Sequence, residues 1–319
     1  MENNSMKTSA WLCALTMAIS AVASADTIKQ DPKDTALSGV EIAFDQVRVS
    51  MQRLLKSSNG EYFLSLYAGI WNPSATLTRL DNQRVLTFKG KQKGNDLDLE
   101  VVNLQENDQG IVQLKGELNA NTGVFKSNLI HHDGKIITRR FEPAFKVEDK
   151  PLFIFKFYGI ELPTHKFGKL MTRVDVLDKL NNKVVQSLSG FKVFPNSIGY
   201  MDVNFDGYYD IVLSDLSEGK TLEDRRFIYW MYNPKTQQYQ RASQLEQISG
   251  FPTLYGERQE IDFSNGRVFK VIDGLMHPVA KSLEKSEEKT VENQPEPVQE
   301  PVVDEAQTQA QSFDQENEL

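Results

Sequence analysis

Residues 110–145 read GIVQLKGELNANTGVFKSNLIHHDGKIITRRFEPAF. Three short β-type runs are separated by NANTG (119–123) and HHDG (131–134), which hold the small and polar residues typical of tight turns. Alternation within 111–116 puts apolar side chains on one face, as an antiparallel sheet with one solvated face requires. This stretch therefore predicts an antiparallel β-meander.

The same pattern extends upstream through ATLTRL (75–80), RVLTFKGK (84–91) and DLDLEVVNL (96–104), again with polar turns between the runs. Only VEIAFDQVRVSMQRLLKS (40–57) differs. There Val47, Met51, Leu54 and Leu55 fall on one helical stripe. We therefore predict a β-meander domain over 36–148 with a short leading helix.

A second β-rich domain is predicted over 149–280. It opens with the apolar and aromatic run PLFIFKFYGIEL (151–162). VDVLDKLNNKVVQSL (174–188) predicts a hairpin that turns at Asn181 and Asn182, since asparagine tolerates left-handed turn conformations. Asn233 and Pro234 mark another turn. A twisted barrel, a sandwich or a propeller-like stack of sheets fits this pattern, and we expect a β-propeller-like or barrel-like module.

The run DVNFDGYYD (202–210) has the spacing of a calcium-binding loop, in which alternate oxygen side chains converge on one point and Gly207 permits the sharp bend. An EF-hand loop would end in a glutamate at its twelfth position, but Leu213 stands there, so we expect Asp210 to close the site. The predicted ligands of this structural calcium ion are Asp202, Asn204, Asp206, the backbone carbonyl of Tyr208, and Asp210. An acidic turn without metal is the alternative.

Both ends of the chain look different from a packed domain. Residues 1–25 combine Lys7, an apolar run and Ala23-Ser24-Ala25, which predicts a cleaved signal peptide and a periplasmic location. The one cysteine, Cys13, lies inside this segment, so the mature chain would form no disulfide. Residues 281–319 are rich in Glu, Gln and Pro and predict a disordered acidic tail.

Charge argues against two classes of partner. The tail holds three basic and eleven acidic residues, and this difference equals the net charge of −8 of the whole chain. Residues 1–280 are therefore balanced, with 33 basic and 33 acidic residues, and no basic patch indicates nucleic acid or anionic lipid. The apolar run near the start is too short to span a membrane.

No motif for a nucleophile elbow, a zinc helix or a phosphate-binding loop occurs, and the four histidines are scattered. We therefore expect a protein that is not an enzyme. Glycosidase chemistry needs only two well-placed carboxylates, so a periplasmic hydrolase stays open as an alternative.

The segments 185–213 and 227–261 resemble a family of bacterial periplasmic proteins that share a DxNFDGYxD loop, an aromatic strand and an Asn-Pro-Lys-Thr turn. The meander over 116–145 is similar to an N-terminal β domain often found ahead of this module. The resemblance covers about residues 60–265. It implies a β-propeller-like unit related to lysozyme inhibitors. It also implies a role like that of the immunity proteins in this family, which neutralise lysozyme-like effectors delivered by bacterial secretion systems.

Three functions stay open from the sequence. The first is a periplasmic inhibitor or immunity protein that binds a peptidoglycan-cleaving enzyme through an inserted loop. The second is an envelope scaffolding protein, and the third is the hydrolase. Candidate inhibitory loops contain Ser189-Gly190, Ser249-Gly250 and Ser264, although each is also an ordinary turn sequence.

Overall fold

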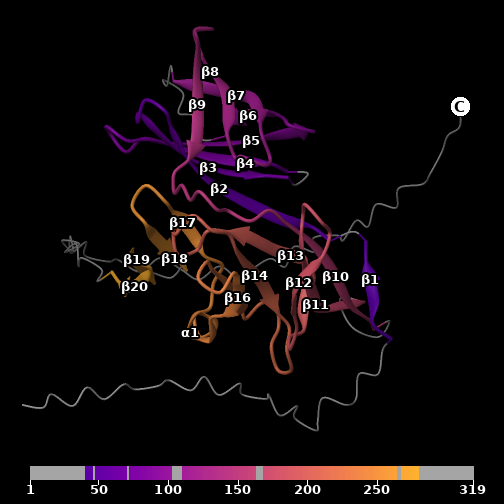
Figure 1. Cartoon of the computed structure of the whole chain (residues 1–319). Coiled ribbons are helices and arrows are strands. Elements are labelled where there is room, and N and C mark those ends of the chain that lie inside the picture. Colours follow the sequence, from indigo (N-terminus) through magenta and orange to yellow (C-terminus); the bar gives the residue numbers. More distant parts are fainter. Residues whose placement is uncertain are drawn as a thin grey trace, which may run out of the picture. The chain divides into compact units, whose positions relative to one another are not determined.

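Eight consecutive strands form a closed antiparallel barrel (Figure 1). Each strand pairs with the next along the chain, and β2 pairs with β9 to close the ring. The strands are β2 (Val49–Ser57), β3 (Tyr62–Ala68), β4 (Ser74–Arg79), β5 (Val85–Lys93), β6 (Asp96–Val101), β7 (Ile111–Leu118), β8 (Phe125–His131) and β9 (Ile136–Pro143). The predicted antiparallel meander is confirmed, and closure removes its edges.

The structure is a computed structural model that describes residues 40–45, 47–69, 72–102, 110–162, 168–263 and 267–279. The predicted signal peptide (1–25) and the predicted acidic tail (281–319) lie outside the described residues.

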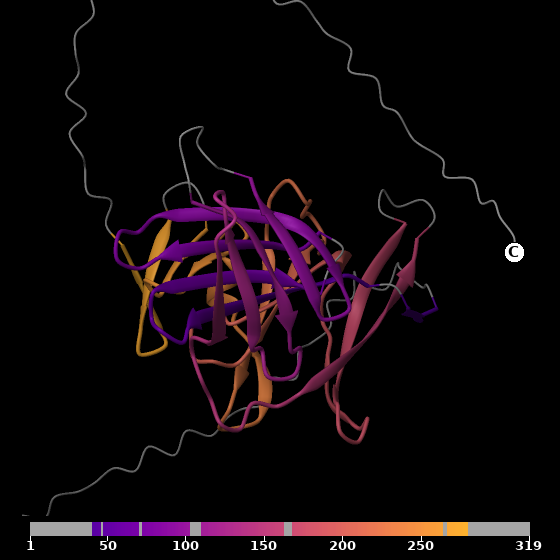
Figure 2. The same ribbon diagram turned by 90° about the horizontal axis from the view of Figure 1, so that it is seen from above.

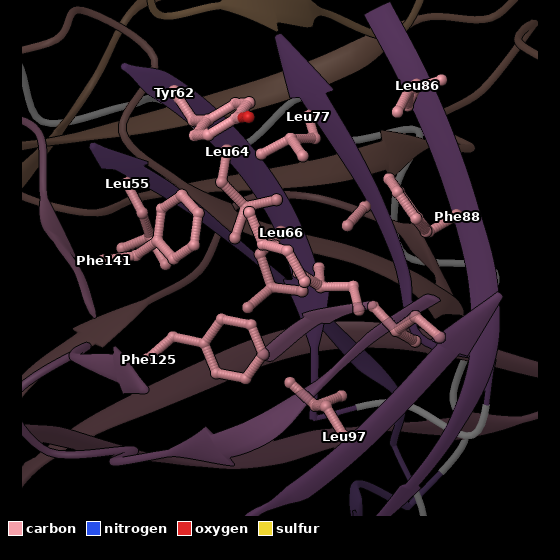
Figure 3. Close-up of a cluster of buried hydrophobic side chains, with 14 of the residues drawn as sticks. Leu55, Tyr62, Leu64, Leu66, Leu77, Leu86, Phe88, Leu97, Phe125 and Phe141 are labelled. Atoms are coloured by element: carbon pink, nitrogen blue, oxygen red, sulfur yellow. The ribbon is translucent and has the colours of Figure 1, made fainter. Parts of the chain in front are cut away.

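Side chains from every barrel strand fill its interior, and Figure 3 shows the labelled ones turned toward one another. Leu64, Leu66 and Leu99 are completely buried there. Full burial of one such side chain contributes about 1.5–3 kcal/mol to folding. Gly116 lets two strands approach closely, because a Cβ atom at this position would stand 2.1 Å from the Lys126 carbonyl oxygen. The barrel interior is thus a packed core.

A second group of strands continues the same sheet beyond the barrel. It comprises β1 (Ile42–Phe44), β10 (Phe153–Glu161), β11 (Lys169–Asp178), β12 (Val184–Leu188), β13 (Val193–Met201), β14 (Asp210–Asp215), β15 (Phe227–Asn233) and β16 (Gln238–Arg241). Strand β13 joins it to the barrel by pairing in parallel with Val49–Met51 of β2. Figure 2 shows the barrel strands, coloured indigo to magenta, from above.

A separate four-stranded antiparallel sheet ends the described chain. It contains β17 (Thr253–Tyr255), β18 (Glu260–Asp262), β19 (Val268–Ile272) and β20 (Leu275–Pro278), and the short helix α1 (Ser243–Glu246) precedes it. Ile261 and Phe263 belong to the same hydrophobic cluster as Leu54 of β2 and Val212 of β14. This small sheet therefore packs on the core outside the barrel.

The leading helix predicted over 40–57 is wrong, because this segment forms β1 and β2. Strand β2 is buried on both faces: Leu55 belongs to the barrel core, and Leu54 belongs to the core outside the barrel. A strand buried on both faces lacks the apolar and polar alternation by which strands are recognised, and the apolar residues of β2 fall by coincidence on a helical stripe that includes Met51.

Both predicted hairpins are confirmed. Strands β11 and β12 pair in antiparallel fashion around a turn in which Asn182 has a φ of 57°. Strands β15 and β16 pair across the turn at Asn233 and Pro234. The predicted boundary at 148/149 lies between β9 and β10. Because β2 belongs to both halves, the division into two folding domains stays a prediction.

Candidate functional site

The acidic loop connects β13 to β14, and its own backbone folds around the first aspartate. The Asp202 carboxylate accepts hydrogen bonds from the backbone N–H groups of Asp206, at 3.0 Å, and Gly207, at 2.9 Å. Phe205 and Gly207 have φ values of 58° and 89°, so the chain takes the left-handed conformations that a tight loop needs. Asp202 therefore shapes the loop from within.

Asp210 connects the loop to the sheet. Its side chain is fully buried, with 0% exposure. One oxygen accepts the Val203 N–H at 2.8 Å and the other accepts the Tyr232 N–H at 2.9 Å. A carboxylate with both oxygens bonded in this way holds the start of the loop against the end of β15.

The five predicted calcium ligands thus lie in one loop, and most of their oxygens meet donors of the chain itself. Asp206 accepts the Tyr208 N–H and the Asn204 amide, both at 2.9 Å. Asn204 Oδ1 is buried and has no hydrogen-bond partner among the described residues. Among all the described residues, no group of three or more His, Cys, Asp or Glu side chains is arranged to hold a metal ion. Calcium binding stays a prediction.

A lysine from outside the loop approaches these carboxylates. Lys150 Nζ donates to the Gly207 carbonyl at 2.6 Å and lies 3.4 Å from the centre of the Tyr209 ring. Burial lowers the pKa of Lys150 to about 8, and the charges of Asp202 and its neighbours oppose this shift. The ammonium group therefore serves as a counter-charge built into the fold.

Two of the aspartates have pKa values that rise on folding. Burial is the main cause for Asp202, whose pKa is raised to about 7, with repulsion from Asp206 as the next contribution. Burial also raises the pKa of Asp210 well above its ordinary range. Clustered carboxylates in a dry site resist ionisation unless a cation is close.

A pocket of about 850 Å³ adjoins the loop. Its walls come from β2, from the turn between β7 and β8 (120–124), from the end of β9, and from the connection that leads into β10. Tyr200 and Tyr209 contribute aromatic surface, as do Phe145 and Phe153. This volume lies within the range of small-ligand sites. The sequence did not predict this pocket, because its walls are far apart along the chain.

Arg53 of β2 also lines the pocket, and its side chain is only 4% exposed. Its Nε and Nη1 atoms are buried without a hydrogen-bond partner among the described residues. Burial lowers the pKa of this guanidinium, but an arginine keeps its charge near neutral pH. The sequence carries no clear signal for this position, because Arg53 lies in the mixed polar and apolar segment MQRLLKS (51–57).

The candidate inhibitory loops lie in different environments. Ser189 and Gly190 are exposed between β12 and β13. Gly250 is buried, and Ser249 Oγ accepts a hydrogen bond from Arg267 at 3.0 Å, so this turn is held within the fold. Ser264 lies outside the described residues. Insertion of any of these loops into an enzyme stays a prediction.

No family model, curated protein or solved structure matches the chain. The resemblance to periplasmic immunity proteins therefore rests on the quoted sequence segments.

Among the described residues, no helix has the length and apolar character needed to cross a membrane.

Proposed function

We propose that this protein is an exported, non-enzymatic binding protein whose recognition site is the pocket between the barrel and the second group of strands. The observation that carries the proposal is the pocket itself, an 850 Å³ hollow with aromatic and cationic walls. Such a combination suits recognition, because aromatic side chains supply contact area and charged groups supply orientation.

The state of the acidic residues in the pocket supports binding over hydrolysis. Glu142 is one of the two carboxylates in the pocket wall, and it pairs with Arg140 and Lys146. A hydrolase of the glycosidase type needs two carboxylates that are free to act as acid and as base or nucleophile. Glu142 is therefore poorly placed for that role.

The more specific proposal is that the bound partner is a peptidoglycan-cleaving enzyme, which this protein inhibits in the periplasm. The resemblance of the loop region to lysozyme-inhibitor-type immunity proteins supports it. A propeller-like second half is part of the same proposal, and the consecutive four-stranded meanders β13–β16 and β17–β20 fit it. A structural calcium ion in the acidic loop fits the buried Asn204 Oδ1 atom.

A substitution that fills the pocket tests the proposal. Ala120 is exposed, lies in the turn between β7 and β8, and lines the pocket. Ala120→Trp should weaken capture of partners from a periplasmic extract, and inhibition of a lysozyme acting on a cell-wall suspension, by at least about tenfold. Ala43→Trp is the matched control, since Ala43 is exposed on β1 and does not line the pocket.

Other outcomes would contradict the proposal. Equal capture and inhibition by wild type and Ala120→Trp would show that the pocket takes no part in the function. Clearing of the cell-wall suspension by the protein alone would identify a hydrolase. Partner capture that survives Ala120→Trp but is lost when 281–319 are deleted would favour the scaffolding alternative.

A further inference from the structure

The pocket wall contains Arg53, a buried cation whose Nε and Nη1 atoms have no hydrogen-bond partner among the described residues. On β2, Arg53 points to the same side as Leu55, whose side chain lies in the barrel core. Pairing between β2 and β9 covers only Leu55–Ser57, so Arg53 lies two residues beyond the last pair. Arg53 therefore lies just past the end of the pairing between β2 and β9, and it lines the pocket.

The other cations of the pocket wall already have partners. Arg140 and Lys146 share Glu142. Lys150 donates to the Gly207 carbonyl, and Lys179 donates to Asn121 Oδ1 at 2.7 Å. Arg53 forms no ion pair with any described residue, and two of its donor atoms are buried without an acceptor. Burying a charged donor without a partner is costly, so such a group is retained where it serves binding.

We infer that the pocket binds a ligand through a carboxylate group, which pairs with the guanidinium of Arg53, while the aromatic wall holds an apolar body next to that group. This inference rests on the proposed function and names the chemistry of the group recognised. A guanidinium offers two parallel N–H donors that match the two oxygens of a carboxylate.

The aromatic wall of the pocket indicates the chemistry of the rest of the ligand. This wall consists of Phe145, Phe153, Tyr200 and Tyr209. Their rings line the same pocket as Arg53, and all four are partly buried. Partly buried aromatic rings favour an apolar or aromatic group attached near the carboxylate. A small aromatic acid and the C-terminal residue of a polypeptide share this chemistry.

The test compares acids with their amides. The probes are N-acetyl-phenylalanine, N-acetyl-Ala-Ala-Phe with a free C-terminus, and the C-terminal amide of each, with binding to the full chain measured by calorimetry. We expect the acids to bind at least about tenfold more tightly than the amides, because the amides cannot form a charge-assisted pair. Binding of the tripeptide acid alone would show that the site recognises the C-terminal ends of polypeptides. Binding of both acids would show that it also accepts small aromatic acids.

Arg53→Met provides the second part of the test. It should reduce the affinity for the acids at least about tenfold. It should also leave the melting temperature of the unliganded protein unchanged or higher, because it removes a buried unpaired charge. Arg258→Met is the control, since Arg258 pairs with Glu257 and Glu260 and does not line the pocket. It should leave binding of the acids unchanged.

Three results would overturn the inference. Equal binding of acids and amides, or no binding of either, would exclude carboxylate recognition. A melting temperature several degrees lower in Arg53→Met would show that Arg53 has a structural partner. If Arg53→Met captured protein partners normally while Ala120→Trp did not, the pocket would keep its proposed function and only the carboxylate assignment would fail.

Discussion

The acidic loop and the Arg53 pocket adjoin each other, and they differ in whether their buried ionisable side chains have hydrogen-bond partners. Each oxygen of Asp210 accepts a backbone N–H, and Asp202 is bonded twice in the same manner. Arg53 is buried to a similar extent, but two of its donor atoms have no acceptor among the described residues. Buried polar groups with hydrogen-bond partners support the fold, whereas buried donors without an acceptor are a cost that folding alone does not explain.

Lys150 lies at the border between the two regions. It bonds to the loop at Gly207 and also lines the pocket. Its ammonium group is hydrogen-bonded to the loop. Arg53 is then the cation of the pocket wall whose buried donor atoms have no acceptor among the described residues. The comparison therefore predicts that loop substitutions change stability and that Arg53 substitutions change binding.

The largest expected effect is the loss of stability in Asp210→Ala. This change removes the acceptors of the Val203 and Tyr232 N–H groups and leaves two buried donors unpaired. Because each orphaned donor costs roughly 1–3 kcal/mol, we expect the free energy of unfolding to fall by about 3 kcal/mol in urea denaturation. Asp81→Ala, at an exposed surface ion pair, should change it by less than about 0.5 kcal/mol. Similar losses of stability in the two variants would show that the hydrogen bonds of Asp210 do not stabilise the fold.

Calcium should have the next largest effect. If the loop binds the ion, a hundredfold excess over Kd stabilises the folded state by about 2.7 kcal/mol, and chelation should lower the melting temperature accordingly. Asp206→Ala should make the melting temperature insensitive to chelator, because this variant has already lost the site. Identical melting curves of the wild type in calcium and in chelator would leave Lys150 as the counter-charge of the loop and would refute the metal site.

The smallest expected effect is a pH dependence in chelator. The pKa of Asp202 is raised to about 7 on folding, so the folded state holds a proton that the unfolded state has lost above pH 4. This contribution to stability is fully present below pH 4 and is lost as pH rises toward 7, at no more than about 1.4 kcal/mol per pH unit. Asp202→Asn should flatten the slope between pH 5 and 7 in thermal melts. Stability of the wild type that rises over this interval would contradict the assignment.

The hairpins and the acidic loop could be predicted from the sequence because they depend on neighbouring residues. Alternating side chains select a strand, and Asn182 permits the turn within a few positions. The same local chemistry places Asp202 and Gly207 in one tight loop. The predicted helix over 40–57 failed because a strand buried on both sides loses the alternation by which strands are recognised.

Short-range sequence patterns are therefore enough to specify antiparallel β-hairpins and one acidic loop. The folded molecule adds the long-range pairings: β2 closes the barrel with β9 while it pairs with β13, and Arg53 lies where the β9 pairing ends. It also brought Lys150 to Gly207, 57 residues further along the chain. The physical reason is that turns and alternation are short-range properties, whereas strand pairing and the desolvation of a charge depend on segments that meet only in the folded molecule.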